Sequence, residues 1–323
     1  MNSVESVDVR TVGEFLALAF AISWLSAAAS YLLGIEYGSL ASLALVLAFF
    51  MWAPAVAAVI VLKRRGRSIR RSCGVRRGRV RWLVLAWLTP IFLVGGTIAV
   101  GLTIPGVTLT TEYGTYLLEA GLTEAQVEDA LATLEALPFP PAALFVGQGL
   151  LAGLTINALA ALGEELGWRG LLLTELAPLG FWRLSAITGF VWGLWHAPIV
   201  LQGHNFPEAP VLGVAVMTVA TVAVSPVYTY LTVRARSVLA ATFLHGSFNG
   251  LGALSLVYLA GGGNLLVSPV GVAGVGAALL ATAVCLAHDR YVATTPITTG
   301  GPLRPWGLSG DDRPLDRNAE LDR

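Results

Sequence analysis

Long apolar runs, separated by short polar or Gly/Pro-containing stretches, follow one another along most of the chain. A helix that spans a bilayer needs about 20 mainly apolar residues, and several of these runs reach that length. The pattern predicts an all-α, polytopic membrane bundle of about eight transmembrane helices. The predicted spans are Phe15–Gly34, Leu40–Leu62, Trp82–Ile104, Pro141 to about Leu176, Leu184–Gln202, Val211–Val233, Val238–Leu259 and Leu265–Ala287.

Basic residues are concentrated between the second and third spans. The stretch 63–81 contains ten Lys or Arg residues, which the positive-inside rule assigns to the cytoplasm. Eight spans then place both termini and nearly all other arginines on that side. The stretch 105–140 falls on the opposite side and is acidic. Within it, Thr123 and Gln126 have the spacing of a capping box, which predicts a short amphipathic helix.

Composition supports the membrane assignment and excludes several other classes. Hydrophobic residues make up 55% of the 323 positions and charged residues 12%, and the mean hydropathy is +0.72. Soluble domains carry about a quarter charged residues. The two cysteines, Cys73 and Cys285, are far apart in the sequence and form no framework, which argues against a disulfide scaffold and against a cysteine zinc site. The basic stretch suits contact with anionic lipid, so no nucleic-acid partner is expected.

The chain divides into a series of regions without a recognisable repeat. A cytoplasmic N-terminus (1–14) precedes three spans with the basic loop 63–81 (15–104). The acidic outer loop (105–140) leads to a core (141–287) that holds the buried ionisable residues. A tail rich in Pro, Gly, Asp and Arg (288–323) is expected to be a disordered cytoplasmic segment.

The stretch ALGEELGWRGLL (161–172) carries three charged residues inside an apolar span: Glu164, Glu165 and Arg169. A charge near the bilayer centre costs at least about 2.5 kcal/mol, so these side chains are expected to face a partner or a cavity. Glu165 and Arg169 are four residues apart, in the favourable order for an ion pair. Glu164 points about 100° away from Glu165, which allows it a separate role.

Later spans carry three further polar candidates. His196 precedes Pro198 in GFVWGLWHAP, and His245 and Asn249 lie four residues apart in FLHGSFNG. Their heights allow them to meet Glu164 in one cavity. Such a set could activate water for attack on a carbonyl, with Glu164 as general base and His245 and Asn249 as oxyanion donors. Alternatively, His196, His245 and a glutamate could bind zinc. Spacing does not decide between these alternatives.

The segment EELGWR, followed by His196 and then HGSFN (245–249), resembles the pattern of the CPBP intramembrane proteases, also called the Abi or CAAX-protease family. The resemblance covers about residues 141–260. It implies an eight-helix fold like that of type II CAAX prenyl endopeptidases, with a cavity open to the cytoplasm. It also implies an active site at Glu164, His196, His245 and Asn249, supported by Glu165 and Arg169. The family's second motif is commonly FxxxH, whereas Trp192 stands four residues before His196.

The favoured function is therefore an intramembrane endopeptidase acting on a membrane-associated, CAAX-like or lipid-modified protein or peptide, with or without zinc. One alternative is a catalytically silent family member that serves as a membrane scaffold or immunity protein. A proton-coupled transporter is a further alternative, disfavoured because no inverted repeat is visible. Nineteen arginines against the single Lys63 suggest a prokaryotic cell membrane. The sequence does not define the substrate or the oligomeric state.

Overall fold

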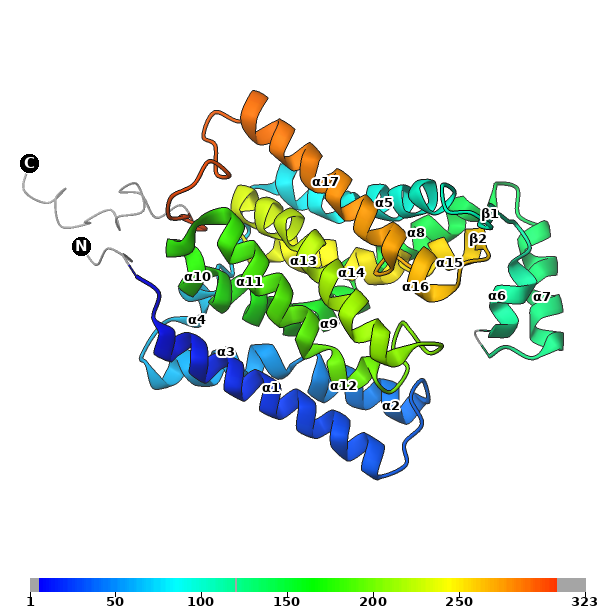
Figure 1. The fold of residues 1–323 in the computed structure, drawn as a ribbon, viewed down its shortest axis with the longest axis horizontal. Coiled ribbons are helices and arrows are strands. Elements are labelled where there is room, and N and C mark those ends of the chain that lie inside the picture. The colour runs from blue at the N-terminus through cyan, green and yellow to red at the C-terminus, as the bar shows by residue number, and fades with distance from the viewer. Residues whose placement is uncertain (1–5, 120, 307–323) are drawn as a thin grey trace, which may run out of the picture.

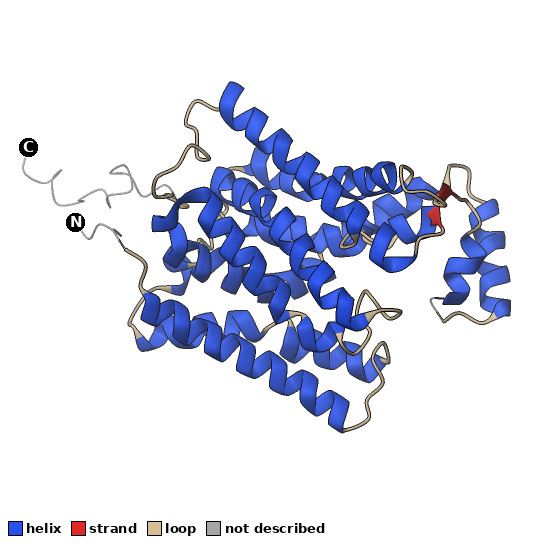
Figure 2. Cartoon of the chain, in the orientation of Figure 1, coloured by secondary structure: helices blue, strands red, loops and turns tan. Residues whose placement is uncertain are grey.

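The computed structural model describes residues 6–119 and 121–306. These residues form a bundle of helices, so the predicted all-α class is confirmed (Figure 1). Figure 2 shows how little strand accompanies the helices. Within the described residues the strands are β1 (Thr108–Leu109) and β2 (Leu259–Ala260), which pair antiparallel with Thr108 opposite Ala260.

Five helical stretches among the described residues are long and apolar enough to cross a membrane. Each coincides with a predicted span, with ends shifted by a few residues. They are α1 (Val9–Leu32); Leu40–Arg64, built from α2 (Leu40–Leu45), η1 (Val46–Phe50) and α3 (Ala53–Arg64); α5 (Val80–Gly101); α13 (Pro210–Ala235); and Gly263–Tyr291, which contains α16 (Gly263–Val267) and α17 (Val272–Tyr291).

A sixth candidate span is broken. Pro141–Leu154 and Ile156–Trp195 qualify together but are bent by 50° at the intervening residue. This region contains α8 (Pro141–Leu154), α9 (Ile156–Glu165), η2 (Leu166–Leu172), α10 (Leu173–Leu176), η3 (Ala177–Leu179) and α11 (Gly180–Trp195). α11 leads from the end of the bundle where α10 lies to the end where α12 (Ala197–Val200) lies (Figure 1).

The predicted number of eight spans is not confirmed. The predicted span Val238–Leu259 contains only α14 (Val238–Leu251) and the short α15 (Leu254–Tyr258). With 14 residues, α14 is about 21 Å long, less than the roughly 30 Å of bilayer hydrocarbon. It packs against α5, α8, α9 and α13, so protein surrounds it. Hydropathy registers its apolar composition but does not distinguish a protein environment from lipid.

Small residues allow the helices that carry the candidate site to approach one another closely. A Cβ atom on Gly163 would lie 2.7 Å from the carbonyl oxygen of Met51, and one on Gly170 would lie 2.8 Å from Cβ of Cys73. The glycines of this region thus form faces on which neighbouring segments pack closely. A Cβ on Gly246 would lie 2.7 Å from the carbonyl oxygen of Gly153. The last contact holds α14 directly against α8.

The basic segments gather at one end of the bundle, around α4 (Ile69–Ser72) (Figure 1). Arg64 pairs with Glu14 at 2.9 Å, and Arg67 pairs with Glu175 at 2.6 Å. These pairs join segments that are far apart in the sequence. The side of the membrane that this end faces stays a prediction.

The expected disorder of the tail 288–323 is wrong for residues 288–306, and residues 307–323 lie outside the described residues. Helix α17 continues to Tyr291. Beyond it, the backbone N–H of Thr298 donates a 2.9 Å hydrogen bond to Asp289. Trp306 is 3% exposed, and its indole N–H donates to Thr174 at 2.9 Å. The polar composition suggested a solvated chain, but hydrogen bonds to Asp289 and Thr174 and the burial of Trp306 hold this segment against the bundle.

The acidic outer loop forms a small helical hairpin at the opposite end (Figure 1). It consists of α6 (Tyr113–Glu119) and α7 (Glu124–Glu135). The capping box predicted at the start of α7 is confirmed: Thr123 and Gln126 each bond the other's backbone N–H. Val127 is the buried residue of α7, and the rest of its surface is partly or fully exposed.

Candidate active site

Two irregularities in one helical segment position the charged residues. Thr155, with φ −120° and ψ −105°, interrupts the helix between α8 and α9. Ten residues later, α9 ends at Glu165 and continues as the π-helix η2, which contains Arg169. Short π-helical segments widen the turn locally and occur often at functional sites. Here the widened turn lies directly beside the two glutamates.

Glu165 is the centre of a buried ionic network. One of its carboxylate oxygens accepts a hydrogen bond from Arg169 Nη1 at 3.1 Å and contacts His245 Nδ1 at 2.8 Å. The side chains of Glu165 and Arg169 are 0% and 1% exposed. The predicted ion pair between these residues is thus present. Because the carboxylate also holds His245, the pair connects α9, η2 and α14.

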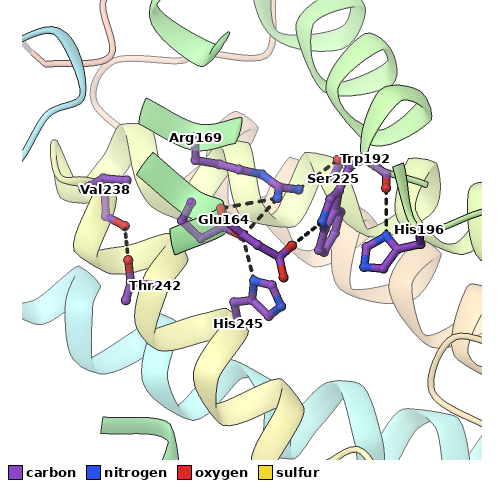
Figure 3. A network of polar contacts seen from close by, with 9 residues as sticks. Glu164, Arg169, Trp192, His196, Ser225, Val238, Thr242 and His245 are labelled. Atoms are coloured by element: carbon purple, nitrogen blue, oxygen red, sulfur yellow. Dashed lines mark hydrogen bonds and ion pairs between the residues drawn. The ribbon is translucent and has the colours of Figure 1, made fainter. Parts of the chain in front are cut away.

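Arg169 is enclosed by further contacts that the sequence did not suggest. Its Nη2 donates to Ser225 Oγ at 3.2 Å (Figure 3). Its guanidinium carbon lies 4.3 Å from the ring centroids of both Trp192 and Tyr228. A guanidinium over aromatic faces gains cation–π attraction, especially where water is excluded. Arg169 therefore fixes the relative positions of η2, α11 and α13.

Glu164 has different partners from Glu165, as its direction on the helix predicted. The indole N–H of Trp192 donates a 2.8 Å hydrogen bond to Glu164 Oε2 (Figure 3). Glu164 is 2% exposed, and this bond ties it to α11. Because the bond uses only one carboxylate oxygen, it orients the carboxylate and leaves Oε1 for another partner.

His196 ends α11 and is 6% exposed. Its Nδ1 lies 2.8 Å from the carbonyl oxygen of Trp192, so this nitrogen carries the proton and Nε2 is left to accept (Figure 3). The ring of His204 is parallel to that of His196, with centroids 6.3 Å apart. Tyr37 in turn bonds His204 Nδ1.

A cavity of about 400 Å³ brings the predicted residues together. Glu164, His196, His245 and Asn249 all line it, as the common height along their helices suggested. Glu165 and Arg169 are not among its lining residues. Instead, Glu165 contacts His245, and Arg169 contacts Trp192, the donor to Glu164. The remaining wall is mainly apolar, with side chains from α5, α13 and α17. Four polar groups thus line one mainly apolar chamber, a common form of ligand site; Glu164, His196 and His245 are buried, whereas Asn249 is exposed.

One end of the cavity is lined by His204, Asn205 and Asn264. These residues lie next to α12 and in α16, at the end of the bundle opposite α4 (Figure 1). Access from the side of the basic loop stays a prediction, and the lining residues of this end do not support it. His204 also lines the cavity, although it was not among the residues predicted for the site.

Trp192 is the main contributor to the site that motif reasoning missed. The sequence did show one signal: Trp192 stands where the family's motif commonly has phenylalanine. Only the indole N–H makes that difference chemically meaningful, since phenylalanine has no hydrogen-bond donor. Ser225 and Tyr228 gave no comparable signal, because a single serine or tyrosine in an apolar span is common.

The zinc alternative concerns His196, His245 and a glutamate. Among the residues that the structure describes, no group of three or more His, Cys, Asp or Glu side chains could hold a metal ion. His245 Nδ1 is engaged by Glu165, and the rings of His196 and His245 make edge-to-face contacts with Trp192, with centroid distances of 5.6 and 5.4 Å. Zinc binding by His196 and His245 stays a prediction.

Comparison with known families supports the assignment of this region. Residues 146–251 match the family model described as Type II CAAX prenyl endopeptidase Rce1-like. The match contains every candidate site residue and the whole of α9, α11, α13 and α14. No curated protein shows significant similarity to the chain. Residues 146–251 are therefore similar to a CAAX-type protease domain, and the five long apolar helical stretches suggest a multi-pass membrane protein.

Proposed function

We propose that the protein is an intramembrane endopeptidase that hydrolyses a peptide bond with water activated by Glu164. The observation that carries the proposal is the position of this carboxylate. Glu164 lines the chamber together with two imidazoles and a carboxamide, and one of its carboxylate oxygens accepts a hydrogen bond from Trp192. A carboxylate in an apolar, water-poor site is a stronger general base than one in bulk water.

In the proposed reaction Glu164 accepts a proton from a water molecule in the cavity, and the resulting hydroxide attacks the carbonyl carbon of the substrate. His196 Nε2 accepts the second water hydrogen and so orients the attacking oxygen. The carboxamide of Asn249 donates to the oxyanion that develops on the carbonyl oxygen, and His245 joins it when its Nε2 carries a proton. Glu164 then passes its proton to the leaving amine, and the C–N bond breaks.

Glu165 and Arg169 are positioning residues in this scheme. They lie outside the cavity lining, and Glu165 holds the Nδ1 side of His245. A neighbouring carboxylate fixes the tautomer and direction of an imidazole. Arg169 in turn holds Glu165 and packs on Trp192, the donor to Glu164. In this scheme Glu164 takes part in the reaction itself, and Glu165 holds His245 in position.

The proposed substrate is a membrane-associated protein or peptide, CAAX-like or lipid-modified. Support comes from the Rce1-like match and from the mainly apolar cavity wall. The proposed setting is the cell membrane of a prokaryote, with the basic end and both termini in the cytoplasm. The positive-inside rule supports this orientation.

The test uses purified full-length protein in liposomes with a pool of membrane-anchored and C-terminally lipidated peptides. New peptide termini are measured by mass spectrometry for wild type, Glu164→Gln and the control Glu175→Gln. Glu175 is another buried glutamate, but it pairs with Arg67 outside the cavity. Cleavage by wild type and the control alone supports the proposal. Equal cleavage by Glu164→Gln contradicts it, and loss of cleavage on chelation would require a metal-dependent scheme.

Absence of any cleavage, with a folded wild type, would favour the scaffold alternative. In that case a biological effect of the protein would survive Glu164→Gln. The two outcomes are separable because the scaffold role needs the helices and not the carboxylate.

A further inference from the structure

A second, larger cleft lies at the basic end of the bundle. Its volume is about 1050 Å³, and it shares no lining residue with the Glu164 cavity. The start of α5 and the final turns of α13 and α17 form its walls, and residues 292–304 border it. We call it the arginine cleft.

Among the residues that the structure describes, five arginines and no acidic residue line the arginine cleft. They are Arg79, Arg81, Arg234, Arg236 and Arg304. Asp289 pairs with Arg234. In the described part of the chain, the other four have no carboxylate within ion-pair distance.

The positive charges in the arginine cleft lie close to one another. Partial burial, together with the charges of Arg236 and two further arginines, lowers the pKa of Arg79. Like charges held together in a fold favour a bound anion that offsets their repulsion. Guanidinium groups are well suited to phosphate, because they offer several donors in one plane.

The opposite end of the arginine cleft is apolar. Along α5 the lining changes from Arg79 and Arg81 to Leu85 and then Phe92, roughly 20 Å deeper at 1.5 Å per residue. Phe92 is 76% exposed, and Val284 on α17 is 69% exposed. These side chains lie within candidate membrane spans, so their exposed surfaces suit hydrocarbon. The cleft therefore combines an arginine-rich end with an apolar end.

We propose that the arginine cleft binds an anionic phospholipid, with the phosphate among the arginines and the acyl chains along Leu85, Phe92 and Val284. Two observations support this assignment: the arginines complement the charge of a phosphate, and the lining changes from arginines to apolar side chains along α5. A soluble phosphate compound would use only the arginine end, whereas a phospholipid uses both ends. The site is independent of the proposed peptidase activity.

The experiment measures phosphatidylglycerol bound to the full-length protein in detergent by native mass spectrometry. The test variant is Arg79→Gln/Arg236→Gln. The matched control is Arg10→Gln/Arg183→Gln, which removes two exposed arginines that do not line the cleft. We expect the test variant to bind phosphatidylglycerol about 30-fold more weakly than wild type does, because each basic residue near an anionic lipid surface contributes about 1 kcal/mol. The control is expected to bind as wild type does.

Two further arms identify the ligand. Phosphatidylcholine, which has no net charge, is expected to bind much more weakly than phosphatidylglycerol. Glycerophosphoglycerol, the same headgroup without acyl chains, is expected not to compete at equal concentration. Equal loss of lipid from both double variants would overturn the proposal, because general surface charge would explain it. Full competition by the chainless headgroup would also overturn it, in favour of a soluble phosphate ligand.

Discussion

Replacing Trp192 with phenylalanine separates the hydrogen bond to Glu164 from the rest of the site. The substitution removes the indole N–H that donates to Glu164 Oε2 at 2.8 Å. It keeps an aromatic ring next to the guanidinium of Arg169, 4.3 Å from the present ring centroid. Phenylalanine is also the residue that the motif of the resembling family commonly has here. The variant therefore tests whether this chain depends on the tryptophan for the direction of its proposed base.

The expected size of the effect follows from the bond that is lost. A hydrogen bond to a charged group contributes about 1.5–3 kcal/mol, and each 1.36 kcal/mol corresponds to a tenfold change in rate. If the bond serves to orient Glu164 during catalysis, kcat falls by about 10- to 150-fold. KM is expected to change little, because Trp192 bonds the carboxylate and not the substrate in the proposed scheme.

The assay is steady-state cleavage of the best peptide found for wild type, with thermal unfolding measured on the same preparations. Trp168→Phe is the matched control: Trp168 is 0% exposed, its indole N–H has no partner among the described residues, and it does not line the cavity. The control is expected to lose some stability without a comparable loss of kcat. A folded Trp192→Phe variant whose kcat stays within about threefold of wild type would refute the reasoning.

Three further predictions concern stability and reactivity. Glu165→Ala leaves Arg169 buried without its carboxylate and is expected to lower the free energy of unfolding by about 3–5 kcal/mol. Adding Arg169→Met should recover part of this loss, and additive losses of the two substitutions in thermal unfolding would argue against the network. Gly246→Ala is expected to cost about 1–3 kcal/mol through contact with α8, whereas Gly147→Ala, with open space around it, should be nearly neutral. Burial raises the pKa of the Cys73 thiol to about 12, so little thiolate forms below that pH. In a Cys285→Ser background, alkylation of Cys73 at pH 8 should be about a thousandfold slower than alkylation of a free cysteine, and its rate should increase as the pH rises. Rapid labelling of Cys73 at pH 8 in the folded protein would contradict its burial.

Local patterns in the sequence predicted the parts of the site that depend on local geometry. The four-residue spacing of Glu165 and Arg169 predicted their ion pair, and the different direction of Glu164 allowed it a separate role. The capping box at Thr123 was equally local. In each case the helix alone fixes which side chains can meet.

The features that escaped prediction depend on tertiary packing. The hydrogen bond from Trp192 to Glu164 joins residues 28 positions apart, and the contact of Glu165 with His245 spans 80. The short helix α14 has the apolar composition of a membrane span because it is buried in protein. Similarly, Trp306 anchors a segment whose polar composition suggested disorder. Composition reports how apolar a segment is, but not which neighbours surround it.

The most direct measurement of the central claim follows isotopic oxygen from water into the product. Wild type, Glu164→Gln and Glu175→Gln cleave one membrane-anchored peptide in H₂¹⁸O, and mass spectrometry reads the new C-terminal carboxyl group. The account predicts one ¹⁸O atom in the product of wild type and of Glu175→Gln, and no product from folded Glu164→Gln. Labelled product forming at the wild-type rate in Glu164→Gln would contradict the role of Glu164 as the base that activates water.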